Sequence, residues 1–185
     1  MTTLLGSIVF YAILGLALAI MVLYVVPIVL AYGFTGGSTF VPTSRHKIER
    51  VLDTITMKPG ALMMDLGCGD GRFLVAAEKR YGVKAVGFEV NPTAFLLARL
   101  NILLHGGRAK VYLKNLWKAH LGEADYVICY LYPDALRSLK RKFDDELKPG
   151  SVVVSCDYPI EEWRQPEVIT YETQRKEETI YVYHM

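Results

Sequence analysis

The residues best suited to chemistry lie in the stretch "MMDLGCGDGR", where an acidic residue ends an apolar run and a glycine follows at every second position. The acidic residue is Asp65, the glycines are Gly67, Gly69 and Gly71, and Cys68 lies between the first two. Glycine lets the backbone turn tightly at a strand end and lets a ligand approach the main chain closely. The spacing therefore predicts a ligand-binding loop between a strand and a helix, in which the size of Cys68 matters more than its thiol.

A second carboxylate, Glu89, ends the next apolar run, "KAVGFEV", 18 residues after Gly71. A carboxylate at that place can accept hydrogen bonds from both hydroxyls of a ribose. The segment "KNLWK" follows the third apolar run, where it is positioned to meet the edge of an adenine ring. Four residues next to these strand ends complete the predicted site: Val90, Asn91, Asn115 and Leu116.

Two adenosine-containing ligands fit such a site. A nicotinamide enzyme would share the glycines and Glu89, but the dinucleotide fingerprint GxGxxG needs a glycine at the position of Arg72. The GxGxG turn with Asp65 on the strand suits a ligand that has an amino-acid end, with its carboxylate toward loop amides and its amine toward Asp65. The sequence thus predicts S-adenosylmethionine as cofactor and S-adenosylhomocysteine as product.

Alternating helix and strand patterns must position these residues from Ser44 onward. Helices are predicted over 44–57, 71–81, 92–105 and 133–147, the third of which starts with the cap-and-proline pair Asn91-Pro92. Strands are predicted over 61–66, 84–90, 110–113, 125–132 and 151–156, and the runs 167–172 and 179–184 read as an antiparallel hairpin. Repeated strand–helix–strand units predict an α/β fold whose parallel sheet has helices on both faces.

The first 44 residues contain no charged side chain, and all 21 basic and 19 acidic residues follow. A helix over residues 8–30 would be about 34 Å long, which matches a hydrocarbon core of about 30 Å. A cleaved signal peptide would have a basic start and a shorter apolar core, and a buried helix of a soluble protein would not be apolar on every face. Residues 4–34 are therefore predicted to cross the lipid bilayer once.

The charges that follow this segment predict its orientation. Arg45, Lys47 and Arg50 come directly after it, and the bias of basic residues toward the cytoplasmic side places the catalytic domain there, or on the matrix side in an organelle. The predicted organisation is a transmembrane anchor over 1–34, a linker over 35–43 and a catalytic domain over 44–185.

Composition argues against several other classes of protein. A net charge of +2 favours neither a nucleic-acid partner nor a strongly acidic one. The three cysteines show no CxxC spacing and the four histidines show no metal-ligand spacing, so no metal site is expected.

Six stretches resemble one family of membrane-anchored protein-lysine methyltransferases within the class I S-adenosylmethionine-dependent methyltransferases. They are "FVPTSRHKIERVL", "GFEVNP", "LARLN", "NLWK", "LKPGSVVVS" and "YPIEEW", and the resemblance covers residues 39–185. It implies a Rossmann-like seven-strand methyltransferase sheet with six parallel strands and an antiparallel one inserted near the edge. Eukaryotic members modify the mitochondrial adenine nucleotide translocase and the ATP synthase c subunit, and a soluble archaeal relative is known.

The resemblance also implies roles for single residues. Asp65 and the loop glycines would hold the methionine end and Glu89 the ribose, and Asn115 would face the adenine amine where the family has aspartate. Phe40 stands where the family has tyrosine. The turn Tyr130-Leu131-Tyr132-Pro133 replaces the Asn/Asp-Pro-Pro-aromatic turn of enzymes that methylate planar nitrogens, which disfavours nucleic-acid bases and glutamine as substrates.

An aromatic pocket would serve a lysine substrate, because desolvation and the sulfonium charge lower the pKa of its amine and aromatic faces attract an ammonium. The candidates for its wall are Phe40, Tyr130, Tyr132, Tyr158 and Trp163. No dedicated general base is evident. The sequence thus predicts methylation of a lysine in a protein, with membrane proteins among the candidates. The alternatives are methylation of a quinone or lipid, and a non-catalytic cofactor-binding scaffold in which Asn115 and Phe40 mark lost activity.

Overall fold

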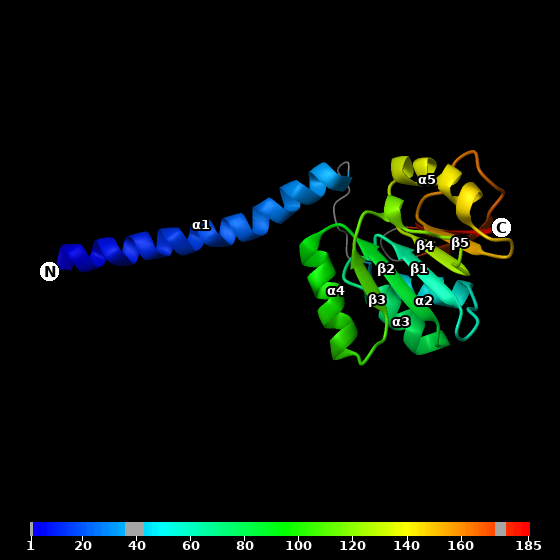
Figure 1. Cartoon of the computed structure of the whole chain (residues 1–185), viewed down its shortest axis with the longest axis horizontal. Coiled ribbons are helices and arrows are strands. Elements are labelled where there is room, and N and C mark those ends of the chain that lie inside the picture. The colour runs from blue at the N-terminus through cyan, green and yellow to red at the C-terminus, as the bar shows by residue number, and fades with distance from the viewer. Residues whose placement is uncertain (1, 36–42, 173–176) are drawn as a thin grey trace. The chain divides into compact units, whose positions relative to one another are not determined.

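The computed structural model describes residues 2–35, 43–172 and 177–185, and the chain divides into two units, Met1–Thr39 and Phe40–Met185. The first unit contains one long helix, α1 (Thr2–Thr35) (Figure 1). Its stretch Gly6–Val26 has a mean hydropathy of 2.7 and is entirely exposed within the protein. By length and composition, α1 is therefore able to cross a membrane.

The second unit is built on a seven-stranded sheet in the order β3-β2-β1-β4-β5-β7-β6. Its parallel strands in chain order are β1 (Leu62–Leu66), β2 (Lys84–Glu89), β3 (Lys110–Leu113), β4 (Tyr126–Cys129) and β5 (Val152–Cys156). Strand β7 (Glu177–His184) pairs antiparallel with β5 and with β6 (Glu167–Glu172). The predicted sheet, with one antiparallel strand inserted near its edge, is confirmed.

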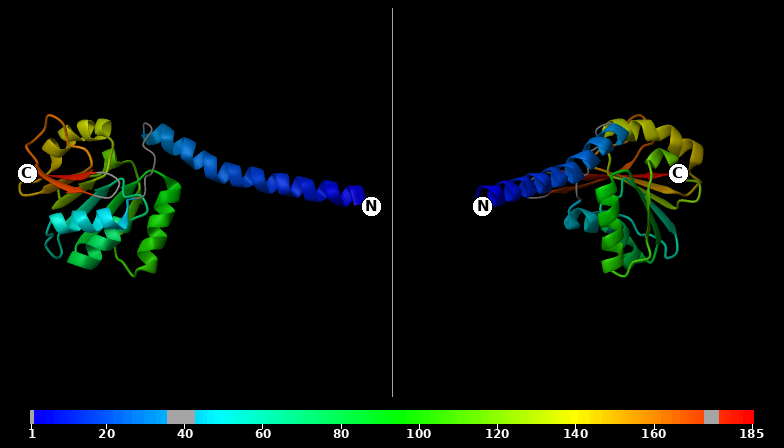
Figure 2. Two further views of the ribbon diagram at one scale, coloured as in Figure 1. Left: turned by 180° about the vertical axis from the view of Figure 1, so that it is seen from behind. Right: turned by 60° about the vertical axis from the view of Figure 1, so that its left-hand side comes forward.

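Helices cover both faces of this sheet. Figures 1 and 2 show α2 (Arg45–Thr54), α3 (Arg72–Tyr81) and α4 (Pro92–Leu104) on one side and α5 (Pro133–Glu146) on the other. Helix α2 starts where the sequence predicts, since the Ser44 hydroxyl accepts a hydrogen bond of 3.1 Å from the Lys47 N–H. It ends three residues earlier than the predicted Met57, because Ile55 is extended and both Ile55 and Met57 turn into the core.

Two hydrophobic clusters fill the space on either side of the sheet. Successive strand residues point to opposite faces. Met63 and Ile128 therefore pack with α2, α3 and α4, whereas Met64 and Val127 pack with α5.

Strand β4 ends at Cys129, although the sequence predicts a strand to Tyr132. The three residues beyond it form the loop that leads to Pro133, the first residue of α5. This loop lies at the carboxyl edge of the sheet, beside the loop that follows β1, and in such sheets ligands bind at this edge.

Candidate functional site

The glycine loop joins β1 to α3 and adopts a backbone that only glycine tolerates well. Gly67, Gly69 and Gly71 have φ angles of 88°, 56° and 72°, in the left-handed region. A Cβ atom on Gly71 would lie 3.0 Å from the Cβ of Ala98, so this glycine also lets α4 pack closely. The amides of Gly67 and Cys68 donate hydrogen bonds of 2.9 and 3.1 Å to the Phe88 carbonyl, which fixes the loop against β2.

Glu89 holds the same loop from the end of β2. Its side chain is buried, one carboxylate oxygen accepts the Gly69 amide at 2.9 Å, and the other accepts the Val90 and Asn91 amides at 2.9 and 2.8 Å. A carboxylate offers about four acceptor positions, so one remains beside Gly69 for a ligand hydroxyl. Glu89 therefore does more than the sequence predicts, because it orders the loop before a ribose arrives.

Asp65 is a buried carboxylate that is 6% exposed. Burial, aided by the negative charges of Glu89 and Asp70, raises the pKa of Asp65 to about 7. Among the described residues, none donates a hydrogen bond to this carboxylate. A buried acid without a donor fits a ligand ammonium, which would stabilise its charged form.

The third part of the site follows β3. The Asn115 side-chain oxygen accepts the Trp117 amide at 3.0 Å and so caps a short 3-10 helix, Leu116–Lys118. Leu116 is half-buried against the second cluster, and the Lys114 amide donates to the Glu89 carbonyl at 3.0 Å. One acceptor position of the Asn115 side chain is thus used within the chain. The Lys114 hydrogen bond fixes the segment after β3 beside Glu89, the residue predicted to bind the ribose.

Gly87 belongs to no motif, yet it shapes the loop. A Cβ atom there would lie 2.5 Å from the Cys68 sulfur and 2.7 Å from the Leu74 side chain. Burial, and then the charges of Asp65 and Glu89, raise the pKa of the Cys68 thiol, which marks Cys68 as packing rather than reactive. A glycine inside an apolar strand is the signal that identifies such a close approach.

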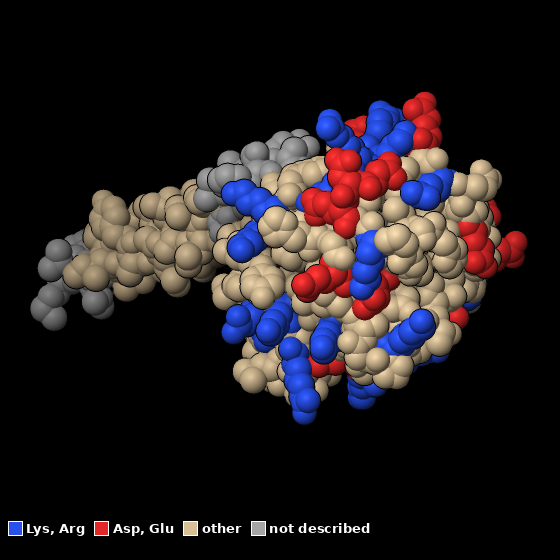
Figure 3. All heavy atoms as spheres, turned by 45° about the vertical axis from the view of Figure 1, so that its right-hand side comes forward, with Lys and Arg blue, Asp and Glu red and all other residues tan. Residues whose placement is uncertain are grey.

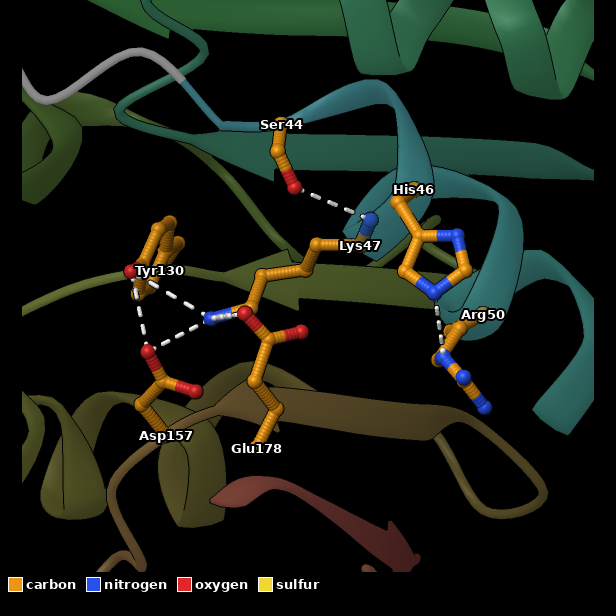
Figure 4. A network of polar contacts seen from close by, with 7 residues as sticks. All are labelled: Ser44, His46, Lys47, Arg50, Tyr130, Asp157 and Glu178. Carbon is orange, nitrogen blue, oxygen red and sulfur yellow. Dashed lines mark hydrogen bonds and ion pairs between the residues drawn. The ribbon is translucent and has the colours of Figure 1, made fainter. Parts of the chain in front are cut away.

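A buried ion cluster joins α2 to this edge (Figure 4). The Lys47 ammonium, on a residue 4% exposed, lies 2.6 Å from the Asp157 carboxylate and 3.7 Å from that of Glu178. It also lies 4.5 Å from the ring centre of Tyr130, whose hydroxyl donates to Asp157 at 2.9 Å. Tyr130 follows β4, Asp157 follows β5 and Glu178 is on β7, so the Lys47 cluster ties three strands to α2. Sequence reasoning missed it, because no local pattern links these residues.

The predicted aromatic wall is only partly assembled. Tyr130 and Tyr132 follow β4 and Tyr158 follows β5; the last two are 46% and 38% exposed. Trp163 instead packs in the second cluster, on the α5 side of the sheet, whereas Tyr130 packs against the first. The centre of the Trp163 ring lies 5.4 Å from that of Phe143 and 5.0 Å from that of Tyr183. Phe40 lies outside the described residues.

These residues fit S-adenosylmethionine. Asp65 offers a charge for its ammonium, the glycine loop offers close backbone approach, and Glu89 offers an acceptor for its ribose. No group of three metal-ligating side chains occurs within 2–35, 43–172 and 177–185.

Known proteins are similar to this chain in sequence. Residues 65–167 match the family described as the ANTKMT methyltransferase domain. The chain is 37% identical over 147 residues to a protein-lysine N-methyltransferase of Saccharolobus islandicus, over 78% of this chain and 91% of that protein. It is 34% identical to the human lysine N-methyltransferase of the ATP synthase c subunit, over 72% of this chain and 57% of that one. It is 37% identical to the mouse adenine nucleotide translocase lysine N-methyltransferase, over 74% and 60%.

A solved structure of a similar protein contains the product form of the predicted cofactor. The chain superimposes with a TM-score of 0.71 and 29% identity on an RNA methyltransferase from Salinibacter ruber in complex with S-adenosyl-L-homocysteine, covering 78% of this chain and 93% of that one. The predicted cofactor and the resemblance are thereby confirmed. The chain belongs to the ANTKMT family of class I, S-adenosylmethionine-dependent protein-lysine methyltransferases.

Proposed function

We propose that this methyltransferase modifies a lysine of a protein that lies in or against a membrane. The observation that carries the proposal is the arrangement at one edge of the sheet. Asp65, whose buried carboxylate accepts no hydrogen bond from the described residues, lies on β1, and Glu89 lies on β2. The tyrosines follow β4 and β5. Two relatives are named for the ATP synthase c subunit and for the adenine nucleotide translocase, which supports a membrane-bound protein as substrate here.

The roles of the cofactor residues follow from their contacts. Asp65 pairs with the ammonium, the backbone of Gly67 to Gly71 approaches the methionine end, and Glu89 accepts a ribose hydroxyl beside Gly69. Cys68, Val90 and Leu116 shape the walls, and Asn91 and Asn115 fix the two segments by capping α4 and the 3-10 helix. When bound, S-adenosylmethionine supplies a methyl group on a sulfonium, which a neutral amine attacks directly.

The chain's own task is to align a lysine amine and make it neutral. A lysine in water has a pKa near 10.4 and must lose its proton before it attacks. Tyr132 and Tyr158, which remain partly exposed at the edge, would desolvate the amine and so lower its pKa. Tyr130 already holds the Lys47 ammonium on its ring, so we assign it to the support of the pocket rather than to its entrance.

We also propose that residues 4–34 anchor the enzyme in a bilayer, with the linker 35–43 and the catalytic domain 44–185 on the cytoplasmic or matrix side. The side is inferred from Arg45, Lys47 and Arg50, the first basic residues after the span. An anchor confines enzyme and substrate to one surface and raises their effective concentration.

The test uses the full chain in detergent, native membranes and S-adenosylmethionine with a tritiated methyl group. Wild type is compared with Asp65→Ala and with Asp134→Ala, whose carboxylate is 98% exposed on α5. We expect labelled protein bands with wild type and Asp134→Ala but not with Asp65→Ala, and methyllysine in their digests.

Other outcomes would replace this function. Label confined to the organic extract would establish a lipid or quinone substrate. Label released by ribonuclease would establish RNA, the substrate named for the Salinibacter ruber protein. Cofactor binding by wild type without any transfer would identify a scaffold.

A further inference from the structure

Helix α4 is apolar on its outer side as well as its inner side. Ala94, Ala98 and Ile102 face the domain and are buried. Five leucines form an outward row with exposures of 46–75%, and we name this row the α4 face: Leu96, Leu97, Leu100, Leu103 and Leu104. Leucines at such spacing form one continuous stripe on a helix, and an exposed apolar stripe of this kind marks an interaction surface.

The stretch of sequence that contains the α4 face carries only positive charge, although Glu78 of α3 contacts the backbone just after α4. From Val90 to Gly122 the sequence has no aspartate or glutamate, whereas residues 123–185 contain 13 acids against 8 bases. The basic side chains of the acid-free stretch are all exposed: Arg99, Arg108, Lys110, Lys114 and Lys118. Figure 3 shows how unevenly charge is spread on one face of the molecule, with Lys and Arg predominant along its lower border and Asp and Glu along its right-hand border.

Two more exposed apolar side chains belong to the sheet edge that α4 contacts and to the turn after it. Leu113 of the edge strand β3 is 48% exposed, and Trp117 in the following turn is 43% exposed. Tryptophan is enriched where a protein meets the headgroup region of a bilayer. Aliphatic, aromatic and basic side chains are thus combined as in helices that lie in a membrane interface.

We infer that the α4 face rests on a bilayer surface rich in anionic lipid. The inference depends on the proposal that α1 spans the membrane, because the anchor keeps the domain close enough for a weak surface contact to form. Leucines would enter the headgroup boundary while the surrounding arginines and lysines pair with lipid phosphates.

Two other occupants fit this surface less well. RNA would satisfy the basic residues but would leave five aliphatic leucines against phosphates and sugars, where arginine, lysine and stacking aromatics are needed. A second copy would bring two basic surfaces of the same sign together across a symmetric interface. The lipid surface alone satisfies the leucines and the charges at once.

The test measures how close the α4 face comes to lipid in the full chain, reconstituted in nanodiscs of phosphatidylcholine with or without phosphatidylglycerol. The native cysteines are all buried, so one added surface cysteine can be labelled selectively. A fluorophore is attached at Leu100→Cys, at Arg141→Cys on α5 as the matched control, or at Leu18→Cys in α1. Quenching by lipids that carry a nitroxide near the headgroup or along the acyl chain is then compared.

We expect the Leu100→Cys label to be quenched at least twofold more than the Arg141→Cys label, and only when anionic lipid is present. In the Leu100→Cys background, Arg99→Glu with Lys110→Glu should reduce quenching to the Arg141→Cys level. Lys140→Glu with Arg141→Glu, which changes the net charge equally, should leave it unchanged.

The Leu18→Cys label separates the two proposals. If Leu18→Cys is quenched and Leu100→Cys is not, α1 inserts and the surface inference is wrong. If neither label is quenched, α1 does not insert, and both the anchor proposal and the surface inference that depends on it are wrong. A change in the fluorescence of the Leu100→Cys label that requires RNA, or that grows with the number of protein copies per nanodisc, would overturn the lipid contact.

Discussion

The Lys47 ammonium lies 2.6 Å from the Asp157 carboxylate, although the two residues are 110 positions apart in the sequence. Lys47 belongs to the first turn of α2 and Asp157 to the loop after β5. Both side chains are largely removed from water, at 5% and 14% exposure. A buried charge that loses its partner is costly, so α2 is held at the edge where the tyrosines lie.

Replacing Lys47 by methionine should therefore destabilise the domain strongly. Asp157 and Glu178 would lose the ammonium that lies 2.6 and 3.7 Å from their carboxylates, and the loss of one partner of a buried pair costs about 3–5 kcal/mol. Arg80→Met is the control, because Arg80 is 38% exposed and its partners Asp53 and Glu49 stay solvated when it is removed, so the loss of stability should be much smaller. Chemical denaturation of both variants checks this, and equal losses would show that the Lys47 cluster is not buried in solution.

The stability of the cofactor-free protein should depend on the ionisation of Asp65. In the unfolded chain this group titrates near 3.8, and in the fold its pKa is about 7. Between these values the unfolded state loses the proton while the folded state keeps it, so rising pH favours unfolding until about pH 7. Asp65→Asn should remove this penalty, and its advantage over wild type should grow by about 3 kcal/mol between pH 5 and 7.5.

Denaturation without cofactor, at several pH values, measures that advantage. Asp134→Asn serves as the control, because it removes a carboxylate that is 98% exposed. A constant difference between Asp65→Asn and wild type would show that Asp65 titrates normally in the fold.

Cofactor affinity should rise with pH in the acidic range for the same reason. Only the charged form of Asp65 pairs with an ammonium, and at pH 5.5 a group with a pKa of about 7 is mostly protonated. We expect S-adenosylhomocysteine to bind wild type roughly tenfold more tightly at pH 7 than at pH 5.5. Titration calorimetry in buffers of different ionisation enthalpy should also detect proton release at pH 7. Asp65→Asn should bind weakly at both pH values, and a wild-type affinity independent of pH would contradict the pairing.

Gly87→Ala should weaken cofactor binding although Gly87 is not in the glycine loop. The added methyl would lie 2.5 Å from the Cys68 sulfur, and such overpacking costs about 1–3 kcal/mol and displaces the loop. Combining it with Cys68→Ala should recover part of both losses. Gly122→Ala is the matched control, because its methyl would lie 3.5 Å from the nearest atom. Wild-type affinity in Gly87→Ala would show that the loop adapts freely.

Local chemistry explains what was predictable. The Asn91 cap, the run to Leu66 and the hairpin at the C-terminal end depend on neighbours in sequence, and their predicted places agree with the structure. The Lys47 cluster was not predictable, since it forms only when α2, β4, β5 and β7 have come together. Trp163 and Tyr130 are both aromatic residues in loops, and the cluster against which each packs is decided only by the folded course of its loop.

The exposure of the leucines on α4 also could not be predicted from the sequence. Its composition predicts a helix, and an apolar helix is ordinarily expected to be buried. Whether Leu96 and Leu100 are buried depends on which elements cover α4, and within 2–35, 43–172 and 177–185 they remain exposed. Exposure is a property of the whole fold, and no window of sequence contains it.

The strand order gives the domain a permanent electric dipole. The acid-free residues 90–122 include β3 at one edge of the sheet, and the acid-rich residues 123–185 include β6 at the other. The positive side of the domain therefore lies toward the β3 edge. A charged surface exerts a torque on such a dipole before any contact forms, and an anionic one would turn β3 toward itself within about a Debye length of 8–10 Å.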